Sequence, residues 1–200
     1  NQNLIGRDQA NFIRLGGELD LDFRDNKGLP RRGMRLLASE TIGFVMNEQD
    51  DPYGLFRLEG EAYATTRGSR PLTLGLRAGG GSSVGPVPFY HLFNLGHGNN
   101  LRGFFRNRFT GSGVMFANSE LRWEPFRVRG LNSPLSAGVK VFTDVGRVFK
   151  KNEESVKWHV GYGFGIFIVP YKENFTLSAT LGYSEEQQSF IRFGFGVPFR

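Results

Sequence analysis

Hydrophobic and polar residues alternate along most of this chain, in long runs separated by short stretches of turn-forming residues. Strict alternation over several residues is typical of a β-strand whose two faces meet different surroundings. The runs fall approximately at residues 13–24, 34–46, 54–65, 72–79, 114–124, 135–146, 157–168, 175–184 and 191–199. Turn-forming residues such as Asn26, Pro30, Pro52 and Gly68 interrupt them. The pattern therefore predicts an all-β protein of about nine antiparallel strands.

One connection differs from the others. Residues 80–113 have no sustained period and are rich in Gly, Asn, Pro and Phe. Connections of this length inside a domain are usually functional or disordered. We therefore treat residues 1–200 as a single region that carries one long functional loop.

The two faces of each run differ in charge. In the first run Leu19 and Leu21 share one face, whereas Glu18 and Asp20 share the other. The remaining runs repeat this division, and Glu40 is the one charged residue on an apolar face. Alternation alone does not decide which face is inside, because a soluble sandwich buries the apolar face and a membrane barrel turns it toward lipid.

Run length and glycine content favour the membrane barrel. A tilted strand needs about 9 to 11 residues to cross a bilayer, whereas soluble strands peak at about 5 to 6. Glycine on the polar face would expose bare backbone on a soluble surface but makes room inside a lumen. The glycines of that face are Gly16, Gly75, Gly79, Gly138, Gly161, Gly163, Gly165, Gly194 and Gly196. We expect an antiparallel transmembrane β-barrel.

Composition excludes several classes of site and protein. The chain has no cysteine, which excludes disulfides, thiolate catalysis and thiolate metal sites. Its apolar stretches are far shorter than the 18 to 20 residues, roughly, of a membrane-spanning helix. A net charge of +6 permits nucleic acid or anionic lipid as a partner without requiring either. Because the chain starts at Asn1 without a Met or an apolar leader, we expect a processed form or a piece of a longer protein.

Some motifs of this chain are also found in enzymes, but the residues around them do not fit an enzyme site. Residues 81–85 match G-x-S-x-G, but Pro86 follows where a nucleophile elbow requires a helix. The glycines of 161–165 lie within a predicted strand, so no helix dipole is available to bind phosphate. The three histidines lack the spacing of metal ligands; they are His91, His97 and His159. We expect no enzyme activity, no cofactor and no metal.

The basic and aromatic residues of 104–109 could stack on single-stranded nucleic acid. A loop between barrel strands explains them already, and we expect no nucleic-acid partner.

Four segments of the chain resemble motifs of one known family, and they occur along the chain in the same order as in that family. They are residues 100–104 (Asn-Leu-Arg-Gly-Phe), residues 22–26 (Asp-Phe-Arg-Asp-Asn) with Pro30 and Gly33 after them, residues 118–122 (Asn-Ser-Glu-Leu-Arg) and residues 141–146 (Val-Phe-Thr-Asp-Val-Gly). Over residues 11–200 the chain resembles the BamA-type outer-membrane assembly factors of the bacterial surface antigen superfamily. The resemblance implies a barrel in the bacterial outer membrane that inserts or translocates proteins. Its partners would be outer-membrane lipid and client β-barrel or secreted proteins.

The Arg-Gly-Phe tripeptide is the family's hallmark, in a loop that folds back into the barrel. Glu120 and Asp144 fall on the charged face of neighbouring runs, so in a barrel both carboxylates point inward and can meet Arg102. The planar guanidinium group of Arg102 suits bidentate carboxylate pairing. Gly103 allows close backbone approach, and Phe104 can pack against the wall. We expect these residues to hold the loop inside the lumen; otherwise Arg102 is a solvated loop cation.

The last run resembles the carboxyl-terminal signal by which outer-membrane barrels are recognised. Apolar residues recur at every second position, and Pro198, which lacks a ladder donor, suits an edge strand. In this family the junction between the first and last strands is thought to open for clients. The residues that we expect at this seam are Phe193, Phe195, Val197, Pro198 and Phe199, although Arg200 follows the expected terminal aromatic.

Nine strands are an odd number, whereas single-chain bacterial barrels have an even number and the family's barrel has sixteen. We therefore expect the chain to be half of a larger barrel, or one protomer of a homodimer that completes the barrel. Two other functions stay open. The barrel could be a passive pore or the anchor of a separate enzyme domain, or it could be a soluble barrel that binds a small apolar ligand.

Overall fold

Nine strands form one antiparallel sheet in which each strand pairs with its neighbours in the chain, so the prediction of an all-β antiparallel fold is confirmed. The computed structural model describes residues 11–46, 51–96, 100–128, 135–150, 157–169, 176–186 and 190–195. The strands of the sheet are β1 (Phe12–Asp22), β2 (Gly33–Val45), β3 (Tyr53–Thr65), β4 (Leu72–Val84), β7 (Gly113–Val128), β8 (Leu135–Phe149), β9 (His159–Val169), β10 (Leu177–Ser184) and β11 (Phe190–Phe195).

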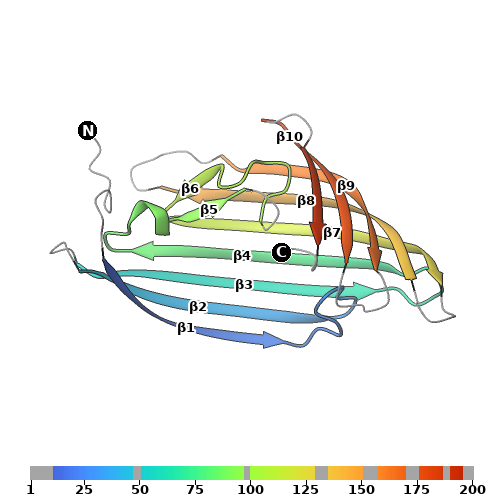
Figure 1. The fold of residues 1–200 in the computed structure, drawn as a ribbon, viewed down its shortest axis with the longest axis horizontal. Helices are drawn as coiled ribbons and strands as arrows, with labels where there is room; N and C mark the ends of the chain where they lie inside the picture. The colour runs from blue at the N-terminus through green and yellow to red at the C-terminus, as the bar shows by residue number, and fades with distance from the viewer. Residues whose placement is uncertain are drawn as a thin grey trace.

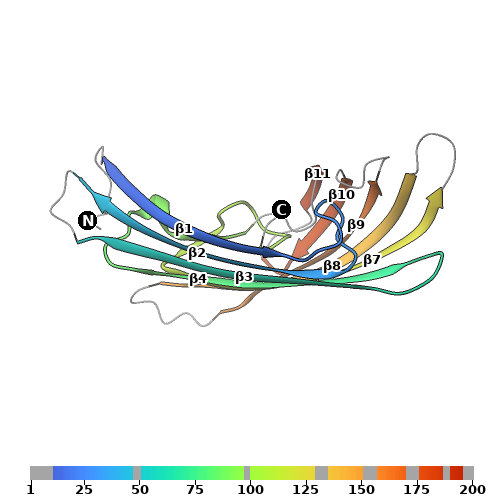
Figure 2. The ribbon, with the colours of Figure 1, turned by 90° about the horizontal axis from the view of Figure 1, so that it is seen from below.

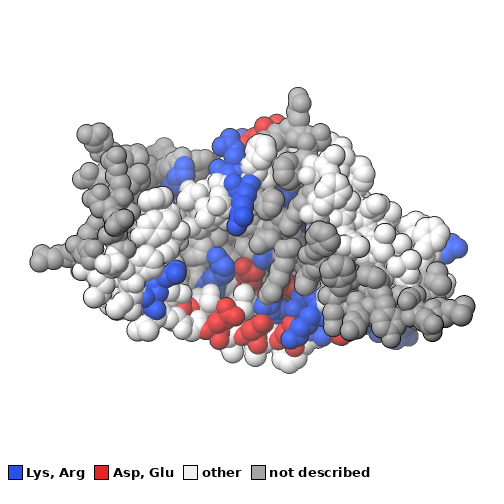
Figure 3. Space-filling view, viewed as in Figure 1, with Lys and Arg blue, Asp and Glu red and all other residues white. Residues whose placement is uncertain are grey.

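The sheet curves into a trough (Figures 1 and 2). The apolar face of each strand lies on its exposed convex side, where Leu58 and Val141 are more than half exposed. Glu61 and Arg77, on the opposite face, are buried in the trough. Figure 3 looks into the trough and shows acidic and basic side chains gathered along its middle. This arrangement is that of a membrane barrel and the reverse of a soluble sandwich.

The two ends of the sheet are open. β1 and β11 are its outermost strands, and they are not paired with each other in the described ranges. A spanning sheet cannot leave an edge in lipid, because each unsatisfied backbone group there costs several kcal/mol. Completion of the barrel by further strands or by a second copy therefore stays a prediction.

β4 is longer than the alternation predicted, because it continues to Val84 instead of ending at residue 79. Gly79, Gly80 and Gly81 carry no side chains and so show no alternation, yet they pair in register with β7. The connection after β4 therefore runs from 85 to 112. It contains the short helix η1 (Phe89–His91) and a two-stranded hairpin of β5 (Phe93–Leu95) and β6 (Phe109–Gly111). Within the described residues, no helix is long and apolar enough to cross a membrane.

Glycine and aromatic residues face each other across neighbouring strands on the trough side. At each pair the ring lies over the glycine, in the space that a β-carbon would occupy. The direct cross-strand pairs are Gly43 with Tyr53, Gly79 with Phe116, Gly138 with Phe167, and Gly163 with Phe142. Among the polar-face glycines of the sequence, Gly79, Gly138 and Gly163 thus provide room for specific rings.

Candidate functional site: an inward loop held by a buried arginine

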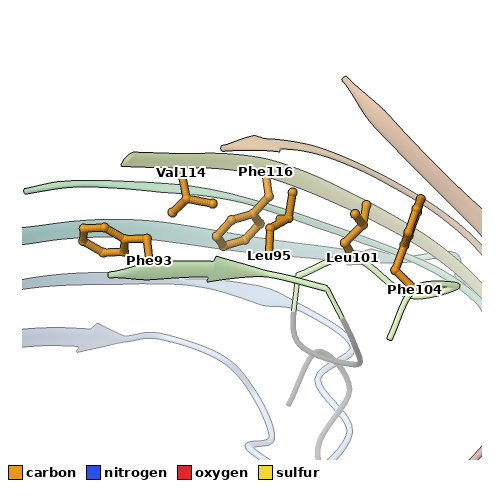
Figure 4. Close-up of a cluster of buried hydrophobic side chains, with 6 residues drawn as sticks. All are labelled: Phe93, Leu95, Leu101, Phe104, Val114 and Phe116. Atoms are coloured by element: carbon orange, nitrogen blue, oxygen red, sulfur yellow. The ribbon is translucent and has the colours of Figure 1, made fainter. Parts of the chain in front are cut away.

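The loop of residues 85–112 folds back onto the trough through an apolar cluster. Leu95 of the loop lies beside Phe116 of β7, with Val114 on one side and Leu101 and then Phe104 of the loop on the other (Figure 4). All five side chains are buried. Burial of a large apolar side chain stabilises by about 1.5 to 3 kcal/mol, so this cluster favours an inward position of the loop.

Three asparagines fix the backbone just before the tripeptide. The Asn100 side chain accepts a hydrogen bond from the Gly96 amide at 3.0 Å and donates one to the Asn94 carbonyl at 2.9 Å. Asn118 of β7 donates from its side chain to the Asn100 carbonyl at 3.0 Å. These bonds tie both the loop hairpin and the sheet to the residue that begins the turn into Arg102.

Arg102 binds two carboxylates on neighbouring strands. Its Nε and Nη2 donate to the two oxygens of Asp144 on β8 at 2.8 and 2.7 Å, in a bidentate pair. Its Nη1 donates to Glu120 on β7 at 2.5 Å. The backbone amide of Arg102 also donates to Asp144, at 2.8 Å. One residue of the loop is therefore held to two strands by four hydrogen bonds.

The surroundings of Arg102 are buried and strongly charged. Glu120 is 1% exposed and Asp144 is fully buried. Arg122 and Lys140 approach Glu120 at 3.6 and 3.7 Å, so two further cations stabilise that carboxylate. Burial opposes the charge on the guanidinium group, but hydrogen bonds to Asp144 and the charges of both carboxylates outweigh it and raise the pKa of Arg102. Arg102 therefore stays charged.

The next residue makes a close backbone contact that only glycine permits. Gly103 has a φ of +90°, in the region that side chains disfavour. A β-carbon at Gly103 would press on the Tyr183 carbonyl oxygen of β10. Gly161 on β9 and Gly182 on β10 are equally constrained, because a β-carbon on them would meet the backbone of Arg102 and of Gly103. The tip of the loop therefore lies directly on the backbone of β9 and β10.

Phe104 completes the contact with the wall. Its ring meets Phe109 of β6 at a centroid distance of 5.5 Å and His159 of β9 at 6.0 Å, both edge-on. Phe109 in turn stacks on His159 at 3.7 Å. Together with Arg102 and Gly103, this side chain connects the loop to every strand from β7 to β10.

An inward loop carrying a buried Arg-Gly-Phe tripeptide on a membrane-type sheet suggests one family, and the family comparison agrees. The model of the Omp85 superfamily domain matches residues 3–197, almost the whole chain. The chain belongs to the Omp85 superfamily. Omp85 proteins are bacterial outer-membrane proteins that insert or translocate other proteins. A search of curated proteins finds no match.

The structure of this Omp85 domain brings together the tripeptide Arg102, Gly103 and Phe104 with Glu120 and Asp144. Sequence reasoning missed several contributors, among them Phe142 and Gly182. Phe142 lies under the guanidinium group of Arg102 at 3.9 Å, and it could have been found because it is an aromatic residue on the charged face of its strand. Gly182 gave no signal, because only the docked loop shows why a side chain is excluded there.

Only part of the predicted seam of this Omp85 domain lies within the described residues. Phe193 pairs with Ala179 of β10, and its side chain is 76% exposed on the convex face. Phe195 pairs with Leu177 at the end of β11. Val197, Pro198 and Phe199 lie outside the described residues.

The residues behind the rejected enzyme and metal motifs have structural contacts. Ser83 lies in β4, and its hydroxyl donates to the Ser112 carbonyl at 2.8 Å. The Tyr53 hydroxyl and His91 Nδ1 are hydrogen-bonded at 2.7 Å, and His159 stacks on Phe109. No group of His, Asp and Glu with a metal-binding arrangement exists among the described residues, and His97 lies outside them.

A cavity of about 810 Å³ remains between the loop and strands β2 to β4. Charged side chains of both signs line it, among them Arg57, Glu59 and Arg106. The inward loop therefore fills only part of the trough.

Proposed function

We propose that this chain forms the loop-bearing part of an outer-membrane barrel that inserts client β-barrel proteins into the membrane or translocates secreted proteins across it. The observation that carries the proposal is the buried pairing of Arg102 with Glu120 and Asp144. A buried charge network of this kind is costly unless every member is paired. The pairing therefore supports the inward position of the loop as its functional position. No covalent chemistry is needed.

In this proposal Arg102, Gly103 and Phe104 form a latch that holds the loop in the lumen, and Glu120 and Asp144 are its partners on the wall. The latch keeps β7 to β10 in one fixed arrangement next to the terminal strand. Phe193, Phe195, Val197, Pro198 and Phe199 form the seam at which a client strand pairs. An edge strand presents unpaired backbone groups, which is the property that strand addition requires.

We also propose how the barrel is completed. The open edges of β1 and β11 pair either with further strands of a longer chain or with a second copy of this one. The mass of the protein purified in mild detergent distinguishes these cases, because a homodimer has twice the chain mass. A stable monomer of this 200-residue chain would contradict completion by a second copy.

The test of function compares Arg102→Ala with Arg106→Ala, an exposed arginine of the same loop. The whole protein is reconstituted in phospholipid vesicles, and insertion of an unfolded client barrel protein is followed by its heat-resistant mobility on gels. We expect Arg102→Ala to slow insertion strongly and Arg106→Ala to retain the wild-type rate. Wild-type vesicles that conduct ions but never accelerate insertion or transfer of a protein would instead indicate a passive pore or an anchoring barrel.

A further inference from the structure

The turn between β1 and β2 is longer than a hairpin requires, and it folds into the trough. Hairpin loops usually have 2 to 5 residues, whereas this connection runs from 23 to 32. It leaves the sheet at the end of the trough opposite to the point where the Arg102 loop leaves it, because β1 and β4 run in opposite directions. In Figures 1 and 2 it curls from the end of β1 toward β9 and β10.

The turn has a defined internal structure. The Asn26 side chain accepts hydrogen bonds from the amides of Gly28 and Leu29 at 2.7 and 2.9 Å. The Asp25 side chain accepts from the amides of Arg31 and Arg32 at 2.9 and 3.1 Å. These two residues belong to the Asp-Phe-Arg-Asp-Asn motif of the sequence, which the function proposed above does not use. The motif therefore shapes a rigid turn.

A buried ion pair ties the turn to β7, the middle strand of the sheet. Arg31 donates from Nε and Nη2 to the two oxygens of Glu124 on β7, at 3.0 and 2.9 Å, across 93 positions of sequence. Glu124 is 1% exposed. Arg122, also on β7, donates to the Pro30 carbonyl at 2.7 Å. This is a second bidentate arginine, separate from Arg102.

Apolar and hydroxyl contacts extend the attachment beyond β7. Leu29 is 1% exposed and packs against Phe167 and Val169 of β9. The Thr65 hydroxyl at the end of β3 donates to the Arg31 carbonyl at 2.5 Å. An ordinary turn lies on the surface in water, whereas this one buries an apolar side chain and pairs a charge with a carboxylate on the middle strand of the sheet.

We propose that residues 23–32 close the lumen as a turn plug, which blocks the end opposite to the point where the loop leaves the sheet and must be released before solutes pass. Arg31 and Glu124 hold it shut, and Leu29 seals it against β9. The inference concerns permeability of the lumen, so it goes beyond client insertion and does not depend on it.

The adjacent arginine provides a matched control. Arg32 is exposed and lies in the same turn, so Arg32→Ala removes the same charge without removing the bond to Glu124. The chain has no cysteine, so Leu29→Cys introduces a unique thiol. Labelling of this thiol by a membrane-impermeant maleimide is measured in the whole protein, in vesicles, with Arg31→Ala, Glu124→Gln, Arg32→Ala or no second change.

We expect labelling to be at least about tenfold faster with Arg31→Ala or Glu124→Gln than with Arg32→Ala, because the labelling rate follows the open population. In the cysteine-free protein, Arg31→Ala should raise ion conductance across a planar bilayer above that of Arg32→Ala. Equal labelling in all four backgrounds, or faster labelling without a rise in conductance, overturns the plug. Neither measurement uses a client, so failure of the plug is distinct from failure of the proposed function.

Discussion

Asp144 receives three hydrogen bonds from Arg102, two from the guanidinium group and one from the backbone amide. A lysine at position 102 would keep the charge but could not reproduce the planar two-bond contact. The role of this residue therefore depends on the shape of its side chain as well as on its charge.

At position 102 we predict that both Arg102→Ala and Arg102→Lys release the loop. Loss of one member of a buried pair costs about 3 to 5 kcal/mol, so cleavage within 85–112 by an added protease should be faster in both variants, and fastest in Arg102→Ala. Mass spectrometry of the fragments measures this. Arg106→Ala is the control, and a cleavage rate for Arg102→Ala equal to that of the control would rule out the latch.

A glycine on the wall should matter as much as the arginine on the loop. In Gly161→Ala the added β-carbon meets the Arg102 carbonyl oxygen, so we predict faster cleavage of the loop even though all the ion-pair partners are intact. Gly60→Ala is the matched control, because open space surrounds that position on β3. Equal protection of the loop in both variants would show that the close approach at Gly161 is unimportant.

At the scale of the strand, alternation predicted where strands lie but failed where side chains are missing or contacts are distant. The end of β4 was hidden by the glycines at 79–81, whose pairing depends on backbone alone. The hairpin of β5 and β6 was hidden because it is stabilised by Val114 and Phe116 of the sheet and has little stability of its own. Local pattern carries no information about such partners.

Glycine–aromatic pairs should contribute to strand pairing. We predict that Gly79→Ala destabilises the barrel by about 1 to 3 kcal/mol, the usual cost of overpacking, because the new β-carbon would lie 2.6 Å from the Phe116 ring. Gly17→Ala on β1 should have little effect, since nothing lies within 4 Å. The temperature at which each variant loses its folded gel mobility measures the difference; identical temperatures would contradict the prediction.

At the scale of the whole molecule, the assignment of a membrane barrel depends on the apolar face of the sheet meeting lipid and the charged face lining the lumen. We predict that a lipid-soluble probe in the bilayer labels cysteines at Leu58 and Val141, which are exposed on the convex face, and spares a cysteine at Glu61, which is buried in the trough. A water-soluble reagent should show the opposite preference wherever the lumen is hydrated. Labelling of position 61 by the lipid-soluble probe in preference to 58 and 141 would reverse the assigned faces.

The parity of charged residues was enough to point Glu120 and Asp144 into the lumen, because strand geometry points every second side chain the same way. Parity says nothing about Arg102, which lies in a loop, and its place beside these carboxylates was expected only from the family resemblance. The inward turn at 23–32 was not predictable in the same way. Its motif was visible, but its partner Glu124 is distant in sequence and sits on a different strand. Only the curvature of the assembled sheet brings the two together.

The contacts of the loop tip also set an order of events during folding. The loop leaves the sheet after β4 and returns at β7, yet Asp144 belongs to β8, Gly161 to β9 and Tyr183 to β10. The tip therefore has no complete binding surface until β8, β9 and β10 have all paired. We expect its insertion to follow the assembly of these strands, so that a chain in which β10 has not paired would leave the tip exposed to quality-control proteases.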